Sequence, residues 1–407
     1  MTGFKGWHVL IASFITAMML AGATFYSFQH IVEPFEKEFS ITVSQINVGM
    51  MVFLLSAAFW AAIIGRSLNR ISPKKFAVAG AIAFGIGFIL ISRIQNPQHM
   101  LWVVFTLIGF GFTACGPFIC NVLTTNWFYK KRGRALGFAA VATSAGGFIV
   151  QPIFVYLLNE LGWRDAIFWM GLSFAGLSLI LALTVIVSRP EDIGQFPDGA
   201  SEPIAQNIVA MDPSKILKNR DFWVIAIACG LLLGSDQALL VSLKKFGLSK
   251  GYPEYSAAAI PIVVAGSAIA GKLFVGFLVE RFDKRKVFSL VCLSNIMFLL
   301  VAIYAQSFIT MVSVAAIVGM AIGGIYPVWT SITADCFGRE YFGPAMGFMN
   351  LITVVFAIVS MGVVGKLYDA HGNYDLAFKI LIPMATLAAI VMMFVRTKQT
   401  QSKKVSS

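Results

Sequence analysis

Long apolar runs dominate this chain and limit what it can fold into. Of its 407 residues, 58% are hydrophobic and only 12% are charged, whereas a soluble domain carries about 25% charged residues. Runs of about 20 apolar residues match the length of a helix that crosses a bilayer. The sequence therefore predicts an all-α membrane protein. Its twelve expected helices are 7–30, 44–64, 75–93, 99–123, 135–158, 165–188, 222–243, 254–279, 286–307, 309–334, 343–365 and 376–395.

The net charge of +12 is distributed unevenly between the two sides that these helices define. We count 22 basic and 10 acidic residues on the side that holds both termini and 8 of each on the other. With Lys272 and Asp236 inside helices, these make up the totals of 31 and 19. An excess of Lys and Arg marks the cytoplasmic side of a membrane protein. We therefore expect both termini in the cytoplasm and no nucleic-acid partner.

The chain divides into two halves that share a repeated loop. Residues 1–188 and 222–396 each hold six predicted helices, separated by a polar linker at 189–221 and followed by a cytoplasmic tail at 397–407. Between the second and third helices of each half, the chain reads "GRSLNRISPKK" (65–75) and "GFLVERFDKRK" (276–286). Matched spacing in corresponding places indicates an internal repeat. The residues that we assign to this gating loop are Gly65, Asn69, Arg70, Gly276, Glu280 and Arg281.

This loop resembles the signature loop of the major facilitator superfamily, with Asn69 and Glu280 where the commonest residue is Asp. The resemblance extends over nearly the whole chain. It implies two six-helix bundles, alternating access between them and a site near the midplane of the membrane.

A second set of motifs resembles one branch of that superfamily. The stretch "NWFYKKRGRALGFAAVATSAGG" (126–147) is similar to a motif of monocarboxylate transporters and their bacterial relatives, including oxalate:formate antiporters. Gly6-Trp7, "GWRDAIFWMG" (162–171) and "RPEDIGQFPDG" (189–199) are also typical of these proteins. The acidic dipeptide that often precedes the Gly-Trp motif in animal members is missing, which favours a bacterial relative. We therefore expect the chain in the inner membrane of a bacterial cell.

Lys272 lies deep in the predicted helix 254–279, about 12 Å from the first loop charge by helical rise. A charge near the bilayer centre costs on the order of 3 kcal/mol, so a partner or a function must retain it. Inward snorkelling is the structural alternative, but the lysine stem does not cover that distance. In monocarboxylate transporters an arginine at this place, followed four residues later by Gly as here by Gly276, meets the substrate carboxylate. Lysine keeps the charge but replaces a two-pronged donor with a point charge.

Asp236 is the second charge inside a predicted helix, and we expect it within about 6 Å of the depth of Lys272. Two roles stay open for it: a proton acceptor for coupling, or a structural counter-ion of Lys272. The Asp that animal members carry one turn before their arginine is Ala268 here, so proton coupling does not follow from the resemblance.

Weaker candidates for the substrate site are other polar or aromatic residues inside predicted helices. Pro327, between Tyr326 and Trp329, predicts a broken helix. A tyrosine at this place resembles one that contacts carboxylate in bacterial relatives. Polar side chains inside membrane helices are more often interhelical contacts than ligands. The full set of expected lining residues is Lys272, Tyr326, Trp329, Asn121, Gln151 and Asn350.

We interpret the chain as a monomeric secondary transporter of a small monocarboxylate anion, working by proton symport or anion exchange, with protons and membrane lipid as its other partners. One rival is an exporter of amphipathic or cationic compounds with a pocket built on Asp236. A second rival, a membrane sensor or scaffold, would need an appended soluble domain, which we do not expect in the short tail. The sequence carries no nucleophile–base pair, metal cluster or cofactor loop, so we expect no enzyme activity, metal or cofactor.

Overall fold

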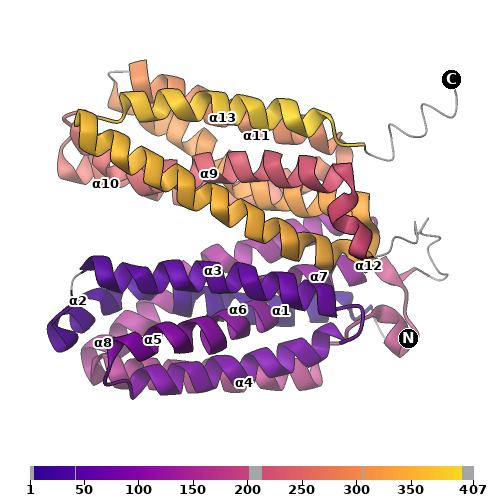
Figure 1. The fold of residues 1–407 in the computed structure, drawn as a ribbon. Helices are drawn as coiled ribbons and strands as arrows, with labels where there is room; N and C mark the ends of the chain where they lie inside the picture. The colour runs from indigo at the N-terminus through magenta and orange to yellow at the C-terminus, as the bar shows by residue number, and fades with distance from the viewer. Residues whose placement is uncertain (1–3, 42, 201–212, 305–306, 397–407) are drawn as a thin grey trace, which may run out of the picture. The chain divides into compact units, whose positions relative to one another are not determined.

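The structure, a computed structural model, describes residues 4–41, 43–200, 213–304 and 307–396. Within these ranges every regular element is helical (Figure 1). Residues 201–212 of the predicted linker and the predicted tail at 397–407 lie outside the described residues.

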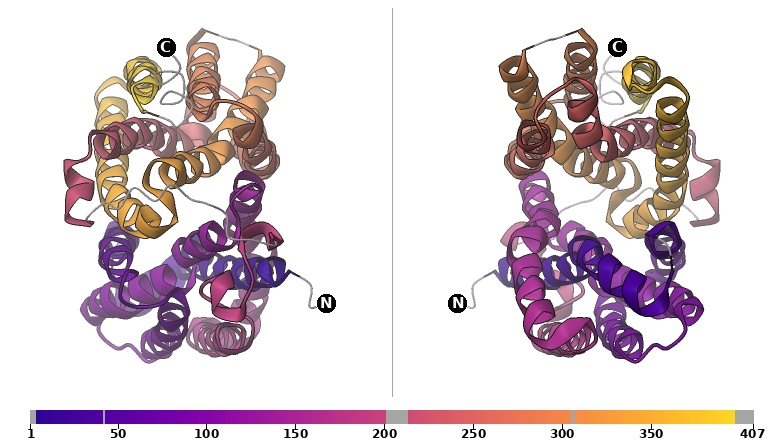
Figure 2. Two further views of the ribbon diagram at one scale, coloured as in Figure 1. Left: turned by 90° about the vertical axis from the view of Figure 1, so that its right-hand side faces the viewer. Right: turned by 90° about the vertical axis from the view of Figure 1, so that its left-hand side faces the viewer.

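Tertiary contacts divide the chain into two units, the first holding most of residues 4–200 and the second most of residues 213–396. Looking along the helices, Figure 2 shows that within each unit they run side by side. The elements of the first unit are α1 (Gly6–Ala21), the π-helical turn η1 (Gly22–Tyr26), α2 (Phe28–Phe39), α3 (Val43–Ser67), α4 (Pro73–Ser92), α5 (Pro97–Val103), the π-helical turn η2 (Val104–Ile108), α6 (Gly109–Cys115), α7 (Pro117–Trp127), α8 (Arg132–Thr184), and the 3₁₀ turns η3 (Pro190–Ile193) and η4 (Pro197–Gly199). Those of the second unit are η5 (Pro213–Lys218), α9 (Arg220–Ser249), α10 (Glu254–Arg281), α11 (Lys284–Tyr304), α12 (Phe308–His371) and α13 (Asp375–Met393).

Ten helical segments of the described chain are long and apolar enough to cross a membrane. Two of them, of 53 and 61 residues, are far longer than the roughly 20 residues that one crossing needs. Each is interrupted once, at Gly162 in α8 and at Gly338 in α12, where φ is +76° and +68°. Glycine adopts this left-handed conformation without a steric penalty. The chain therefore turns back at both glycines, and the ten segments supply the twelve predicted crossings.

Helix ends differ from the prediction where the chain is polar or contains proline. The helical path of the first segment continues through α2 to Phe39, nine residues beyond the predicted end, because its backbone hydrogen bonds persist outside the apolar run. The predicted helix 99–123 is interrupted at Gly116, directly before Pro117 at the start of α7, where the proline ring prevents a continuous helix. The predicted break at Pro327 is wrong, because α12 departs from helical geometry only at Gly338.

Each unit has its own apolar core. In the first, Phe84 stacks on Phe88 with ring centroids 4.4 Å apart, within a cluster of buried residues that also contains Phe112 and Phe154. In the second, α13 lies alongside α9 and α11 (Figure 1), and Phe246 packs against Phe378 at 4.9 Å. Aromatic and branched side chains thus fill the space between helices in both halves of the sequence.

The GWR sequence at 162–164 forms a cluster of hydrogen bonds at the point where α8 turns back. Gly162 turns the chain, and the indole of Trp163 donates a hydrogen bond to Glu38 Oε2 at 2.7 Å. Arg164 donates to Glu38 Oε1 at 2.6 Å and to the carbonyls of Ser92 and Ile94 at 2.9 and 2.7 Å. One guanidinium therefore ties the end of α2 to the end of α4 and to α8.

We expect Arg164→Ala to lower the free energy of unfolding by about 2–3 kcal/mol, because several charge-assisted hydrogen bonds are lost together. The matched control is Arg93→Ala, which removes only a contact of 5.7 Å to the Phe168 ring and should change stability far less. Hydrogen bonds from Arg164 hold the pKa of Glu38 below its ordinary value. A depressed carboxyl pKa stabilises the fold above the unfolded pKa and loses that effect as pH falls through the folded one. In detergent, the free energy of unfolding should therefore be lower for Arg164→Ala than for the wild type at neutral pH, and this difference should disappear only on acidification. A difference that increased on acidification would contradict the assigned role of the Arg164–Glu38 contact.

Candidate functional site

Lys272 lies on α10 beside a close crossing with the first part of α12, and both helices belong to the second unit. A Cβ placed on Gly271 would lie 2.0 Å from the Met320 carbonyl oxygen, and one on Gly323 would lie 2.0 Å from that of Ala268. Glycines that let two backbones touch are a common means of packing membrane helices. Lys272 itself is half-buried. The crossing thus fixes the position of the backbone that carries this cation.

Tyr326 and Trp329 follow the same crossing on α12. Their rings meet edge to face with centroids 5.5 Å apart. Tyr326 is half-buried, and Trp329 is 1% exposed. Within the described residues, the indole Nε1 of Trp329 is buried with no hydrogen-bond partner. The two crossing helices therefore carry a cation and an unsatisfied N–H donor, and each of these groups is of a kind that can bind an anion.

Asp236 on α9 is 1% exposed and accepts a hydrogen bond from the side-chain amide of Asn295 on α11. Asn295 is 1% exposed as well. Asn295 is not among the site residues predicted from the sequence, although a polar residue in the predicted helix 286–307 is a signal that marks a functional or pairing position. The second unit therefore contains a buried carboxyl–amide pair.

The remaining predicted lining residues lie on other elements. Gln151 on α8 is half-buried, and its Nε2 lies 2.8 Å from Nε2 of His30. Asn121 is 4% exposed on α7. Asn350 is half-buried on α12, and its backbone carbonyl accepts from Thr353. Gln151 and Asn121 belong to the first unit and Asn350 to the second. Their assignment to the substrate site stays a prediction.

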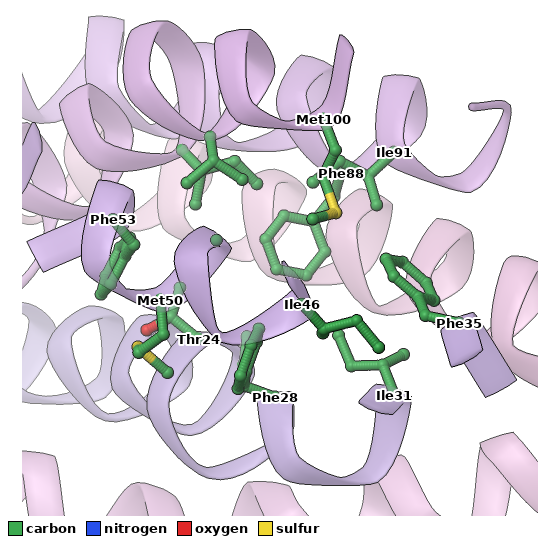
Figure 3. A pocket seen from close by; sticks show the side chains of 14 residues that line it. Thr24, Phe28, Ile31, Phe35, Ile46, Met50, Phe53, Phe88, Ile91 and Met100 are labelled. Carbon is green, nitrogen blue, oxygen red and sulfur yellow. The ribbon is translucent and has the colours of Figure 1, made fainter. Parts of the chain in front are cut away.

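The first unit contains a cavity of about 70 Å³ between its helices (Figure 3). Its walls are almost entirely apolar and include Phe28, Ile31, Phe35, Phe53 and Met100. None of the predicted site residues lines it. An apolar wall offers a carboxylate no donor to replace its water, so this cavity does not suit the anion expected from the sequence.

The two repeated loops make the same kind of hydrogen bond, which the sequence alone does not show. Lys74 and Arg285 occupy the tenth position of the two repeats. Lys74 Nζ donates to the Leu183 carbonyl at 2.8 Å, in the last turn of α8. Arg285 Nη1 donates to the Val395 carbonyl at 3.2 Å, just after α13. In each unit the basic residue satisfies a carbonyl at the end of the last helix, where a cation is favoured.

The residues assigned to the gating loop differ in burial. Gly65 and Gly276 are buried in helices α3 and α10, whereas Asn69 and Arg70 are exposed. Glu280 is half-buried, and the guanidinium of Arg281 lies 4.2 Å from the Phe277 ring centroid. The buried glycines fit a packing role, and the gating role of the set stays a prediction.

Three motifs that are distant in the sequence meet at the predicted cytoplasmic end of the first unit. Asp198 accepts hydrogen bonds from the backbone N–H groups of Tyr129, Lys130 and Lys131 at 3.0, 2.5 and 3.3 Å. These groups lie directly before α8, and a carboxylate is favoured at a helix N-terminus. Beside them, Trp7 meets Phe128 edge to face at 4.9 Å. The motifs at 6–7, 126–133 and 189–199 thus form one structural cluster.

The described chain has ten apolar helical segments of membrane-spanning length, two of which turn back at a glycine, and the same loop contact recurs in each unit. These features define an integral membrane protein of the helical-transporter class. The sequence profile of the Major Facilitator Superfamily matches residues 9–307 and 263–407, and the chain belongs to this family. It is therefore a transporter by family and not an enzyme.

Relatives match over almost the full chain at low identity. Monocarboxylate transporter 12 of Rattus norvegicus is 23% identical over 441 residues, covering 98% of this chain and 88% of the relative. The MFS-type transporter YcxA of Bacillus subtilis is 22% identical over 393 residues, covering 95% and 94%. The Escherichia coli fucose:proton symporter FucP superposes with a TM-score of 0.72 at 17% identity, covering 96% of this chain and all of FucP. The proton:xylose symporter XylE gives the same TM-score at 17% identity, covering 97% and 96%. The two structures establish the fold.

Proposed function

We propose that this protein is a secondary active transporter that moves a small monocarboxylate anion across the membrane by alternating access. The observation that carries the proposal is the half-buried cation of Lys272, on a helix crossing whose other helix holds the unsatisfied N–H of Trp329. An anion bound at Lys272 offsets the charge of the ammonium group and so lowers the cost of enclosing that charge in the membrane. Relatives named as monocarboxylate transporters, matched over almost the full chain, support the same substrate class.

The coupling is proton symport or exchange for a second carboxylate. FucP and XylE, which share this fold, are proton symporters. Asp236 is the candidate for a proton-coupling group, and the residues expected to line the anion site with Lys272 are Tyr326, Trp329, Asn121, Gln151 and Asn350. We place both termini in the cytoplasm, as the distribution of Lys and Arg favours. We place the protein in a bacterial inner membrane, as the missing acidic dipeptide before Gly6-Trp7 favours.

The direct test is counterflow with purified protein in lipid vesicles, using a panel of labelled carboxylates at two pH values. Vesicles loaded with unlabelled lactate or pyruvate should take up the labelled anion faster than empty vesicles. Protein-free vesicles and vesicles loaded with a neutral sugar are the controls. If no carboxylate exchanges and an amphipathic cation does, the chain is the exporter that the rival interpretation describes.

A further inference from the structure

The buried pair of Asp236 and Asn295 leaves two oxygens without partners. The amide Nδ2 of Asn295 donates to Asp236 Oδ1. Within the described residues, Asp236 Oδ2 and Asn295 Oδ1 are both buried and have no hydrogen-bond partner. Both atoms accept hydrogen bonds, so neither can satisfy the other while the carboxyl is ionised.

One proton satisfies both atoms. A carboxylic acid and a primary amide can form two reciprocal hydrogen bonds, N–H to the carboxyl oxygen and O–H to the amide oxygen. The first of these is present. A proton on Asp236 Oδ2 supplies the second, because the protonated oxygen becomes a donor to Asn295 Oδ1. An ionised carboxylate at this depth would instead carry a full charge and an unmet acceptor, each costly away from water.

The elements around the pair supply little that would hold a carboxylate ionised. On α11, Cys292 lies one turn before Asn295, and on α9, Cys229 lies two turns before Asp236; both thiols are buried. On α12, Phe356 and Ser360 pack against Gly230 and Gly234 of α9.

The charged groups of α13 lie away from the pair. On α13, Asp375 and Lys379 lie within the first turns, and Asp375 pairs with Lys250 just after α9 at 3.3 Å. Asp236 is fourteen residues before Lys250, about 21 Å along the helix. Lys272, on α10, is the one membrane-interior cation that the sequence places near this depth.

We propose that Asp236 carries a proton shared with Asn295 as a carboxylic acid–amide pair, and that this pair is the proton site of the transport cycle. The proposal deepens the transport function above and rests on it. Proton release breaks the O–H bond of Asp236 and leaves a carboxylate, with the proton passing to water once α9 and α11 separate at this point. Reprotonation restores the pair. The anion held at Lys272 and the proton at Asp236 then occupy different places in the second unit.

Infrared spectroscopy of the full chain in lipid tests the proton directly. We expect the C=O stretching band of a protonated carboxyl at neutral pH, sensitive to deuterium exchange, lost in Asp236→Asn and shifted in Asn295→Ala. The control is Asp335→Asn, because Asp335 is ion-paired with Lys284 near the end of α12's first part and should not contribute to this band. Absence of the band from the wild-type protein overturns the proposal.

Transport in vesicles tests the coupling. In Asp236→Asn the new amide can donate to Asn295 Oδ1 as the protonated acid does, so the variant should fold and behave as permanently protonated. We expect counterflow of labelled lactate to be retained and accumulation driven by a pH gradient to be lost. Proton-driven accumulation at the wild-type level, or accumulation driven by sodium in place of protons, overturns the proposal. If no carboxylate moves in the wild-type protein, the substrate assignment has failed while the infrared result still decides whether Asp236 holds a proton.

Discussion

Lys272→Gln is expected to reduce carboxylate transport severely while the protein stays folded. Truncating one member of a buried charge pair typically costs about 2–5 kcal/mol, which corresponds to roughly a 30- to 4,000-fold loss at 1.4 kcal/mol per tenfold. Glutamine keeps a similar length and can still donate hydrogen bonds, but it lacks the charge. Removing a cation from the membrane interior also lowers the cost of inserting α10. The loss should therefore appear in the initial rate of lactate or pyruvate counterflow and not in the elution profile of the purified protein.

Two further variants make this result specific. Lys272→Arg keeps the charge and should retain measurable flux. Lys245→Gln removes an exposed lysine whose Nζ lies 5.0 Å from the Tyr368 ring centroid, and it should transport as the wild type does. Wild-type pyruvate and lactate flux in Lys272→Gln would show that the anion is not held at this residue.

Gly323→Val is expected to disrupt the second unit. A Cβ at this position would lie 2.0, 2.7 and 2.8 Å from the carbonyl oxygen, carbonyl carbon and Cα of Ala268. These are backbone atoms of α10, so no side chain can move aside and the helices must separate. Overpacking a core usually costs about 1–3 kcal/mol and occasionally more, and a backbone clash belongs at the upper end. We expect a clear fall in the temperature of unfolding in detergent, together with lost transport, because the same crossing positions Lys272.

The matched control for this variant lies on the same helix. A Cβ on Gly362 meets nothing within 4 Å, so Gly362→Ala should leave stability unchanged or raise it by up to about 1 kcal/mol through helix propensity. An unfolding temperature for Gly323→Val equal to that of the wild type would show that α10 and α12 do not cross as closely as described.

Much of the fold follows from the sequence because each polar or charged residue inside a membrane-spanning helix adds its own free-energy cost. The twelve apolar runs locate the crossings, and the structure confirms an all-α chain of this family. The predicted helix ends and interruptions are wrong where hydropathy does not determine them. It does not reveal that α2 continues to Phe39, and proline alone does not distinguish the interruption before Pro117 from the continuous helix through Pro327.

The candidate site could be predicted only in part. Lys272 and Asp236 could be predicted because a charged residue inside an apolar run is easily recognised in a sequence. Asn295 was missed because an amide costs less to bury than a charge and therefore stands out less. The contact between Gln151 and His30 was missed for a different reason, since nothing in the sequence shows which helix faces α8 at that level.

By itself, the sequence determined which segments enter the membrane, the repeated loop of the two halves and the two charges that the membrane must accommodate. These properties depend on each residue's own solvation and on its order along the chain. The tertiary structure alone decided that Asn295 pairs with Asp236 across 59 residues and that Asp198 accepts hydrogen bonds from the backbone directly before α8. It also decided that Gly271 and Gly323 lie against the neighbouring backbone. Such contacts depend on the rotation and register of packed helices, where one residue turns a side chain by about 100°.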